Sequence, residues 1–107
     1  MVDGDGCEVD PVNAACVQST KYGESTYEDN KSCTITHPPY GLISVISFEV
    51  EAPFKGNCWA DYLTVNGARY CGTDSPAGVM PNGTPIEWHT DGMLTEAGWK
   101  ICFGNHA

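Results

Sequence analysis

Acidic side chains are the most abundant groups in this sequence that could do chemistry. Fourteen Asp and Glu stand against five Lys and Arg in 107 residues, which gives a formal net charge of −9 and a pI near 4.4. A nucleic-acid binder needs a basic face for phosphates, and docking on anionic lipid also depends on basic side chains. The charge balance therefore indicates cations or basic partners as ligands and excludes nucleic acid.

Two acidic residues have a spacing that could support catalysis. Glu49 and Glu51 alternate with apolar neighbours, so they can share one face of a strand, and a carboxylate pair can hydrolyse glycosides. A domain of this length leaves little surface for a cleft, and the sequence has no Gly-x-Ser-x-Gly motif. His37, His89 and His106 have no metal-ligand spacing, and we expect His37 and His106 to be solvent-exposed. We therefore expect no catalytic residue, and a small hydrolase is the least favoured hypothesis.

The six cysteines indicate a disulfide framework. Their number is even, the chain is short, and no pair has the Cys-x-x-Cys spacing of zinc or thioredoxin-like sites. Two sequons, at Asn30 and Asn82, are possible glycosylation sites. No stretch approaches the roughly 18 apolar residues of a membrane span, and residues 1–6 lack the apolar segment of a signal peptide. We expect a mature extracellular protein, either secreted or part of an ectodomain.

Short β-strands joined by Gly- and Pro-containing turns are the structure that the apolar pattern predicts. Apolar residues make up 41% of the chain, with 12 Gly and seven Pro, and no segment has sustained helical spacing. The expected strands cover residues 16–19, 32–37, 42–51, 62–65, 69–71, 86–89 and 99–103. Asn66-Gly67 is a hairpin-turn dipeptide. The prediction is a single all-β domain over residues 1–107, an antiparallel β-sandwich of six to eight strands with three disulfides, preceded by a loose acidic terminus over residues 1–6.

Three blocks of residues, in order, give a resemblance to a known family. The first block is Ser19-Thr20-Lys21-Tyr22 with Tyr27 to Ile35; the second is Pro38 to Gly41, Ser47 to Glu51, Cys58 to Val65 and Arg69 to Gly72; the third is His89-Thr90-Asp91 with Gly98 to Ile101. Over about residues 7–103 the chain resembles the CUB domain, an extracellular β-sandwich module of jelly-roll-like form. The resemblance implies the bridges Cys7–Cys33 and Cys58–Cys71, which leaves Cys16 for Cys102. The alternative is Cys7–Cys102 with Cys16–Cys33.

The resemblance also implies one Ca²⁺ at an end of the sandwich. The ligands of calcium-binding CUB domains match Glu51, Asp61 and Asp91, and Tyr27 matches a tyrosine that hydrogen-bonds the site. The loop after Asp91 would add backbone carbonyls or water. Three carboxylates brought together repel each other, so without a cation at least one should hold a proton or the loops should loosen. Two alternatives stay open: ordinary acids with Asp61 capping a turn, or a CUB-like fold whose site has lost its ion.

Binding is the function that the resemblance implies. In several calcium-bound CUB domains a partner's Lys pairs with the acids of the site, so we expect a calcium-dependent module that recognises a protein ligand presenting Lys or Arg. The alternative is a calcium-independent, lectin-like module, in which an exposed aromatic ring stacks on a glycan. We expect most of the strand aromatics, including Trp59, Trp88 and Trp99, to pack in the core, although Trp59 could be exposed. The domain could also be an accessory module of a larger chain.

Overall fold

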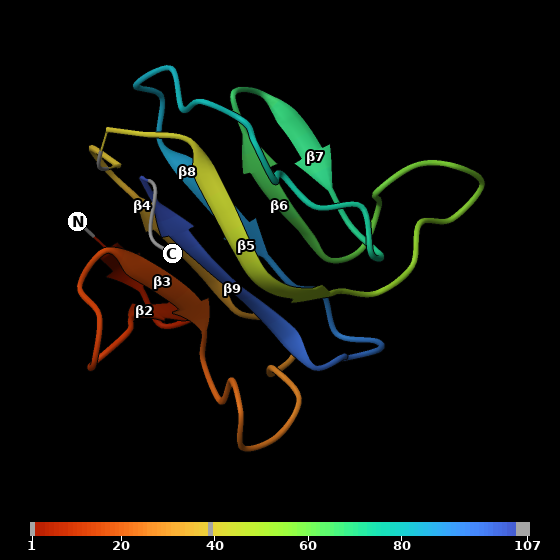
Figure 1. Cartoon of the computed structure of the whole chain (residues 1–107). Coiled ribbons are helices and arrows are strands. Elements are labelled where there is room, and N and C mark those ends of the chain that lie inside the picture. Colours follow the sequence, from red (N-terminus) through yellow and green to blue (C-terminus); the bar gives the residue numbers. More distant parts are fainter. Residues whose placement is uncertain (1, 39, 105–107) are drawn as a thin grey trace.

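The computed structural model describes residues 2–38 and 40–104, and within them the chain forms nine β-strands in two layers (Figure 1). The strands are β1 (Val2–Gly4), β2 (Cys7–Val9), β3 (Cys16–Ser19), β4 (Ser32–Ile35), β5 (Ile43–Glu49), β6 (Tyr62–Val65), β7 (Ala68–Tyr70), β8 (Ile86–His89) and β9 (Gly98–Phe103). The described residues contain no helix, which agrees with the predicted all-β class. A search of these residues for a helix long and apolar enough to cross a membrane finds none.

The strands form two antiparallel sheets. One has five strands in the order β1-β4-β8-β6-β7, and the other has four strands in the order β2-β3-β9-β5. In Figure 1 the strand β5 crosses in front of β8, so the two sheets lie face to face. The predicted β-sandwich with three disulfides is therefore confirmed.

Alternation of apolar and polar residues explains the strands of the five-stranded sheet. Ile86 and Trp88 in β8 are buried, whereas Glu87 and His89 face outward, as side chains of a half-buried strand do. The strand β6 repeats this pattern, and the Asn66-Gly67 turn after it has the positive φ angles that a tight hairpin requires. The central strand β9 is buried at five of its six positions, because the sandwich covers its inner face and β3 and β5 flank it.

Aromatic rings fill the space between the sheets at the end nearest the acidic residues. Trp88 from one sheet meets Trp99 from the other edge-on, with ring centroids 5.6 Å apart, and Tyr27 packs edge-on against Trp88 at 5.1 Å. The core expectation is confirmed for Trp88 and Trp99, which are 1% and 0% exposed. For Trp59 the exposed alternative holds instead of the core position, because it lies in the loop between β5 and β6 and is 66% exposed.

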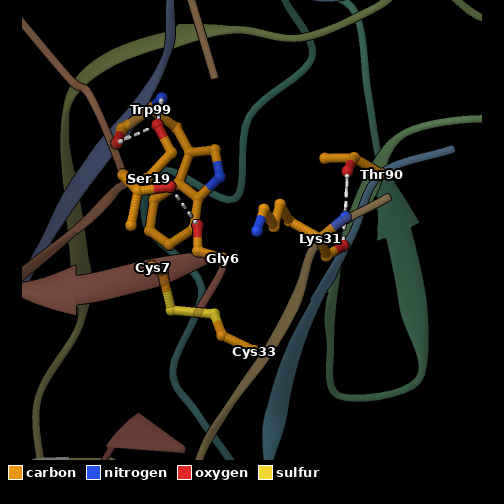
Figure 2. The surroundings of a disulfide bond; sticks show 8 residues. Gly6, Cys7, Ser19, Lys31, Cys33, Thr90 and Trp99 are labelled. Atoms are coloured by element: carbon orange, nitrogen blue, oxygen red, sulfur yellow. Dashed lines mark hydrogen bonds between the residues drawn. A yellow bond between two sulfur atoms is a disulfide. The ribbon is translucent and has the colours of Figure 1, made fainter. Parts of the chain in front are cut away.

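Three disulfides tie the sandwich together. Cys7–Cys33 joins β2 of one sheet to β4 of the other, and its surroundings are shown in Figure 2. Cys16–Cys102 links the neighbouring strands β3 and β9. Cys58–Cys71 joins the loop before β6 to the residue that follows β7. This is the pairing that the resemblance implies, and the swapped alternative is not formed. Three disulfides indicate an oxidising environment such as the extracellular space.

The N-terminal residues differ from the loose terminus that the sequence predicts. Val2–Gly4 pairs with β4 as an edge strand, and the next residue, Asp5, forms an ion pair with Lys31 at 3.0 Å. The adjacent Cys7–Cys33 bridge holds this segment against β4. Ordered backbone pairing therefore replaces the expected disorder, because a strand edge was available to an otherwise polar segment.

Two strands, β4 and β5, are also shorter than predicted. β4 ends at Ile35 instead of residue 37, and the exposed His37 that follows has a positive φ angle before Pro38. β5 ends at Glu49, because the next backbone N–H bonds Gly72 outside the sheet. The exposure expected for His37 is confirmed, while Pro39 and His106 lie outside the described residues.

Candidate metal centre

Three loops carry the predicted acidic ligands to one place. Glu51 follows β5 by two residues, Asp61 directly precedes β6, and Asp91 follows β8 by two residues. The strands β6 and β8 are hydrogen-bonded neighbours, so Asp61 and Asp91 lie at the same end of one sheet, and Glu51 arrives from the other sheet. The cluster therefore sits where both layers meet at an end of the sandwich.

The spacing of the carboxylates suits a single shared cation. One oxygen from each of Glu51, Asp61 and Asp91 lies within 4.8 Å of the other two. Calcium–oxygen distances are about 2.3–2.6 Å, so two ligands of one ion are at most about 5 Å apart. All three separations fall within that limit, and the three side chains can act as ligands of one ion without rearrangement of the strands.

Tyr27 holds two of the three acidic segments in place. Its hydroxyl donates to Oδ2 of Asp61 at 2.6 Å and accepts the backbone N–H of Glu51 at 3.1 Å. Burial and the neighbouring Asp61 carboxylate raise the pKa of this phenol far above its usual value, so the hydroxyl remains a donor. Tyr27 therefore fits the supporting position that the resemblance implies for it.

Asp61 is the buried member of the cluster and organises the loop after β8. Its side chain is almost fully enclosed, and its Oδ1 accepts the backbone N–H of Asp91 at 2.8 Å. Burial raises the pKa of Asp61, opposed by the hydrogen bonds from Tyr27 and from the Asp91 backbone. This hydrogen bond joins the residue before β6 to the loop after β8, and Asp61 also faces the cluster.

Glu51 is the carboxylate that lacks compensation. Its Oε1 is buried and accepts no hydrogen bond from the described residues. Burial raises its pKa, and the charges of Asp61, Asp91, Glu96 and Asp29 raise it further. A buried anionic oxygen without a donor is costly, so a proton or a cation bound at this atom would lower that cost. Glu51 therefore does not behave as the freely solvated acid that the alternative reading requires.

Asp91 sits at the start of an exposed loop. Its Oδ1 accepts the backbone N–H of Met93 at 3.1 Å, and its carbonyl accepts the backbone N–H of Asn30 at 2.9 Å. Thr90, just before it, is buried and accepts the Lys31 N–H at 2.7 Å, a contact shown in Figure 2. These contacts anchor the loop to the segment before β4 and leave its apolar tip in solvent.

No cation of the described residues neutralises the cluster. The two ion pairs among them are Lys31–Asp5 and Lys100–Asp10, which lie elsewhere. Glu49 is exposed on β5 and is not one of the three clustered acids. The unbalanced negative charge is the property that gives this site its chemistry.

Sequence reasoning missed three contributors to this end of the molecule. Glu96 and Asp29 add to the local negative charge, and the apolar tip of the Asp91 loop is exposed, with Met93 at 73% and Leu94 at 61%. Their positions depend on loop paths, and the only signal in the sequence was a Met-Leu pair between polar residues. Comparison with known proteins gave no matching family model, no similar curated protein and no similar solved structure.

Proposed function

We propose that this chain is an extracellular, CUB-like binding module that takes up one Ca²⁺ at Glu51, Asp61 and Asp91 and recognises a basic protein partner there. The observation that carries the proposal is the convergence of three carboxylates within 4.8 Å, with a buried Glu51 oxygen that accepts no hydrogen bond from the described residues. Secretion, and glycosylation at the exposed Asn30 and Asn82, belong to the same proposal.

Calcium suits this donor set better than other common cations. The donors are carboxylate oxygens, which a hard ion prefers, and the group contains no Cys or His of the kind that zinc takes. Magnesium demands near-ideal octahedral geometry at about 2.0–2.1 Å, whereas calcium tolerates irregular ligand sets of six to eight oxygens. Water and backbone carbonyls would supply the oxygens beyond the three side chains.

Partner recognition follows from the charge that remains after the ion binds. Three carboxylates and one Ca²⁺ leave a net charge of −1, which favours an ammonium or guanidinium of the partner beside the site. The net charge of −9 attracts a basic partner over a longer range. The exposed Met93 and Leu94 would add apolar contact next to the charged centre, as in interfaces that join an apolar patch to a polar contact.

Thermal unfolding of metal-free protein tests the calcium part of the proposal. Titration with Ca²⁺ should raise the midpoint, because a ligand at 100 times its Kd stabilises the native state by about 2.7 kcal/mol. Mg²⁺ at equal concentration should have a smaller effect. Asp61→Ala and the closer analogue Asp61→Asn should both abolish the rise, whereas Asp74→Asn, an exposed acid outside the cluster, should retain it. A Ca²⁺ response that survives in both Asp61 variants would refute the site.

Partner recognition is tested by the same variants. A basic ligand, for example a Lys-containing peptide, should bind in Ca²⁺ and lose affinity in excess chelator while the sandwich remains folded. Equal binding in chelator would remove the calcium-dependent mechanism.

One observation favours a second candidate function, calcium-independent glycan binding. Trp59 is 66% exposed, and an exposed indole offers a flat apolar face on which a sugar ring can stack. Simple sugars that compete for the natural ligand in chelator would support this candidate over the first.

A further inference from the structure

A small hollow lies beside Trp59, in the loop that joins β5 to β6. It measures about 250 Å³ and is lined by Gly56, Asn57, Cys58, Trp59 and Arg69. Pockets for drug-sized ligands are about 300–1,000 Å³, so this hollow suits one ring or one side chain of a larger ligand. The Cys58–Cys71 bridge and a two-way backbone pairing of Phe54 with Asn57 hold the loop in shape.

Arg69 is a preorganised cation in this hollow. Its guanidinium lies 4.1 Å from the centroid of the Tyr62 ring, and one of its nitrogens donates to the Cys58 carbonyl at 3.1 Å. The Tyr62 ring in turn packs against the His89 ring of the neighbouring strand β8, with ring centroids 5.1 Å apart, so β8 helps to hold the Tyr62 ring in place. A guanidinium has five N–H donors in a planar fork, and these contacts fix its orientation while leaving donors for a ligand.

The charge at Arg69 is uncompensated in a strongly acidic protein. Arg69 is the only arginine among five basic residues, and no carboxylate of the described residues lies within ion-pair distance of it. A second basic residue, Lys55, is in the loop between β5 and β6 and lies over the Phe54 ring at 5.4 Å. The loop therefore joins exposed aromatic surface to positive charge, which is the opposite of the acidic cluster.

We propose that this hollow binds the ring of an acidic sugar, a uronic acid, with the carboxylate held by Arg69 and the ring face stacked on Trp59. An indole offers an apolar face to the C–H groups of a pyranose, and a guanidinium pairs with a carboxylate through two parallel hydrogen bonds. The exposed Asn57 amide donates one N–H to the Lys55 carbonyl at 3.3 Å and keeps its second N–H and its oxygen for hydroxyl groups. The ligand class rests on the second candidate function above and does not depend on Ca²⁺.

The three tryptophans make the binding measurable at the site itself. Trp88 and Trp99 are buried, so a ligand in the hollow should shift only the indole N–H resonance of Trp59. The probe is methyl β-glucuronide, added to ¹⁵N-labelled protein in excess chelator and again in Ca²⁺. Methyl β-glucoside, which carries a hydroxymethyl group in place of the carboxylate, is the matched neutral ligand. We expect saturable shifts with the glucuronide in both buffers and at least tenfold weaker binding of the glucoside.

Variants separate a built site from general attraction. Arg69→Lys keeps the charge but loses the planar fork, and Trp59→Leu removes the stacking surface, so each should weaken glucuronide binding at least tenfold. Lys21→Gln removes an equal charge from an exposed position outside the loop and should leave binding unchanged. Because Trp59 and Arg69 are exposed, thermal midpoints should confirm that all variants fold.

Each contrary outcome overturns a distinct statement. Glucuronide binding that persists in Trp59→Leu and Arg69→Lys would overturn this hollow while leaving glycan binding elsewhere on the chain. Failure of the wild type to bind any of the sugars would overturn both the hollow and its glycan-binding basis, without affecting the Ca²⁺-dependent thermal shift. An acidic tripeptide that shifts the Trp59 indole as strongly as the glucuronide would overturn the assignment to sugar.

Discussion

Replacement of Tyr27 by phenylalanine is the most informative single change in the acidic cluster. The variant keeps the buried ring and its edge-on contact with Trp88 and removes one oxygen atom. That oxygen donates to Asp61 at 2.6 Å and accepts the Glu51 N–H at 3.1 Å. Tyr27→Phe therefore removes the contact between the cluster and the core without creating a large cavity.

The expected loss of stability follows from these two hydrogen bonds. A hydrogen bond to a charged group contributes about 1.5–3 kcal/mol, and a partly buried donor left unpaired costs about 1–3 kcal/mol. Tyr27→Phe should therefore lower the free energy of unfolding by about 3–5 kcal/mol at neutral pH. Each kcal/mol shifts the midpoint of a domain of this size by about 4–8 °C, so even the lower value gives a shift above about 12 °C. The loss should shrink as pH falls and Asp61 becomes protonated, because the hydrogen bond then no longer involves a charge.

Urea unfolding with the disulfides intact and the metal chelated measures this loss. The matched control is Tyr40→Phe, the same chemical change at a residue that is almost fully exposed, where the expected effect is within about 0.5 kcal/mol. A loss below about 1 kcal/mol in Tyr27→Phe would refute the hydrogen-bond network, and a loss equal at pH 4 and pH 7 would refute the ionised Asp61 on which this magnitude is based.

Three further changes test the charge, the packing and the covalent links. The folded pKa of Asp61 is raised above its ordinary 3.8, so between these two pKa values the native protein binds more protons than the unfolded protein. The free energy of unfolding of the metal-free protein should therefore fall as pH rises through this range. Urea unfolding at several pH values measures the slope, and saturating Ca²⁺ should remove it. Gly98→Ala should lower the free energy of unfolding by about 3 kcal/mol or more, because the new Cβ would collide with the Ser19 side chain, which accepts the Trp99 N–H of β9. Gly23→Ala, also at positive φ but with open space around it, should lower it by only about 1–2 kcal/mol in the same assay. Replacing both cysteines of Cys16–Cys102 by Ala should lower the free energy of unfolding by about 4.6 kcal/mol, against about 2.9 kcal/mol for Cys58–Cys71, because the first bridge spans 86 residues and the second 13. Equal losses in calorimetry would contradict the view that the bridges act by restricting the unfolded chain.

Local patterns in the sequence determined the strands and their inner faces. The alternation over residues 86–89 and the apolar positions of residues 99–103 predict β8 and β9 almost to the residue. Burial of one sheet face requires an apolar residue at every second position, and this spacing is visible in the sequence. The Asn66-Gly67 turn is equally local, since only residues that tolerate positive φ fit it. The even cysteine count indicated disulfides, and the resemblance supplied the pairing and the candidate ligands.

Features that depend on distant segments were decided by the tertiary structure. Val2–Gly4 has no strand signal of its own and pairs because β4 offers a free edge. Trp59, Trp88 and Trp99 are chemically identical, yet the first is exposed and the others are buried, because a loop path and not local periodicity sets the exposure of Trp59.

The candidate sites show the same division. Acidity is visible in the composition, but the buried, unpaired oxygen of Glu51 exists only where loops from both sheets meet. The Arg69–Tyr62 contact likewise joins residues on adjacent strands that share an outer face. The sequence by itself therefore determined which segments become strands and which side chains carry charge. The tertiary structure alone decided which charges converge, because convergence depends on how strands far apart in the chain are ordered in the two sheets.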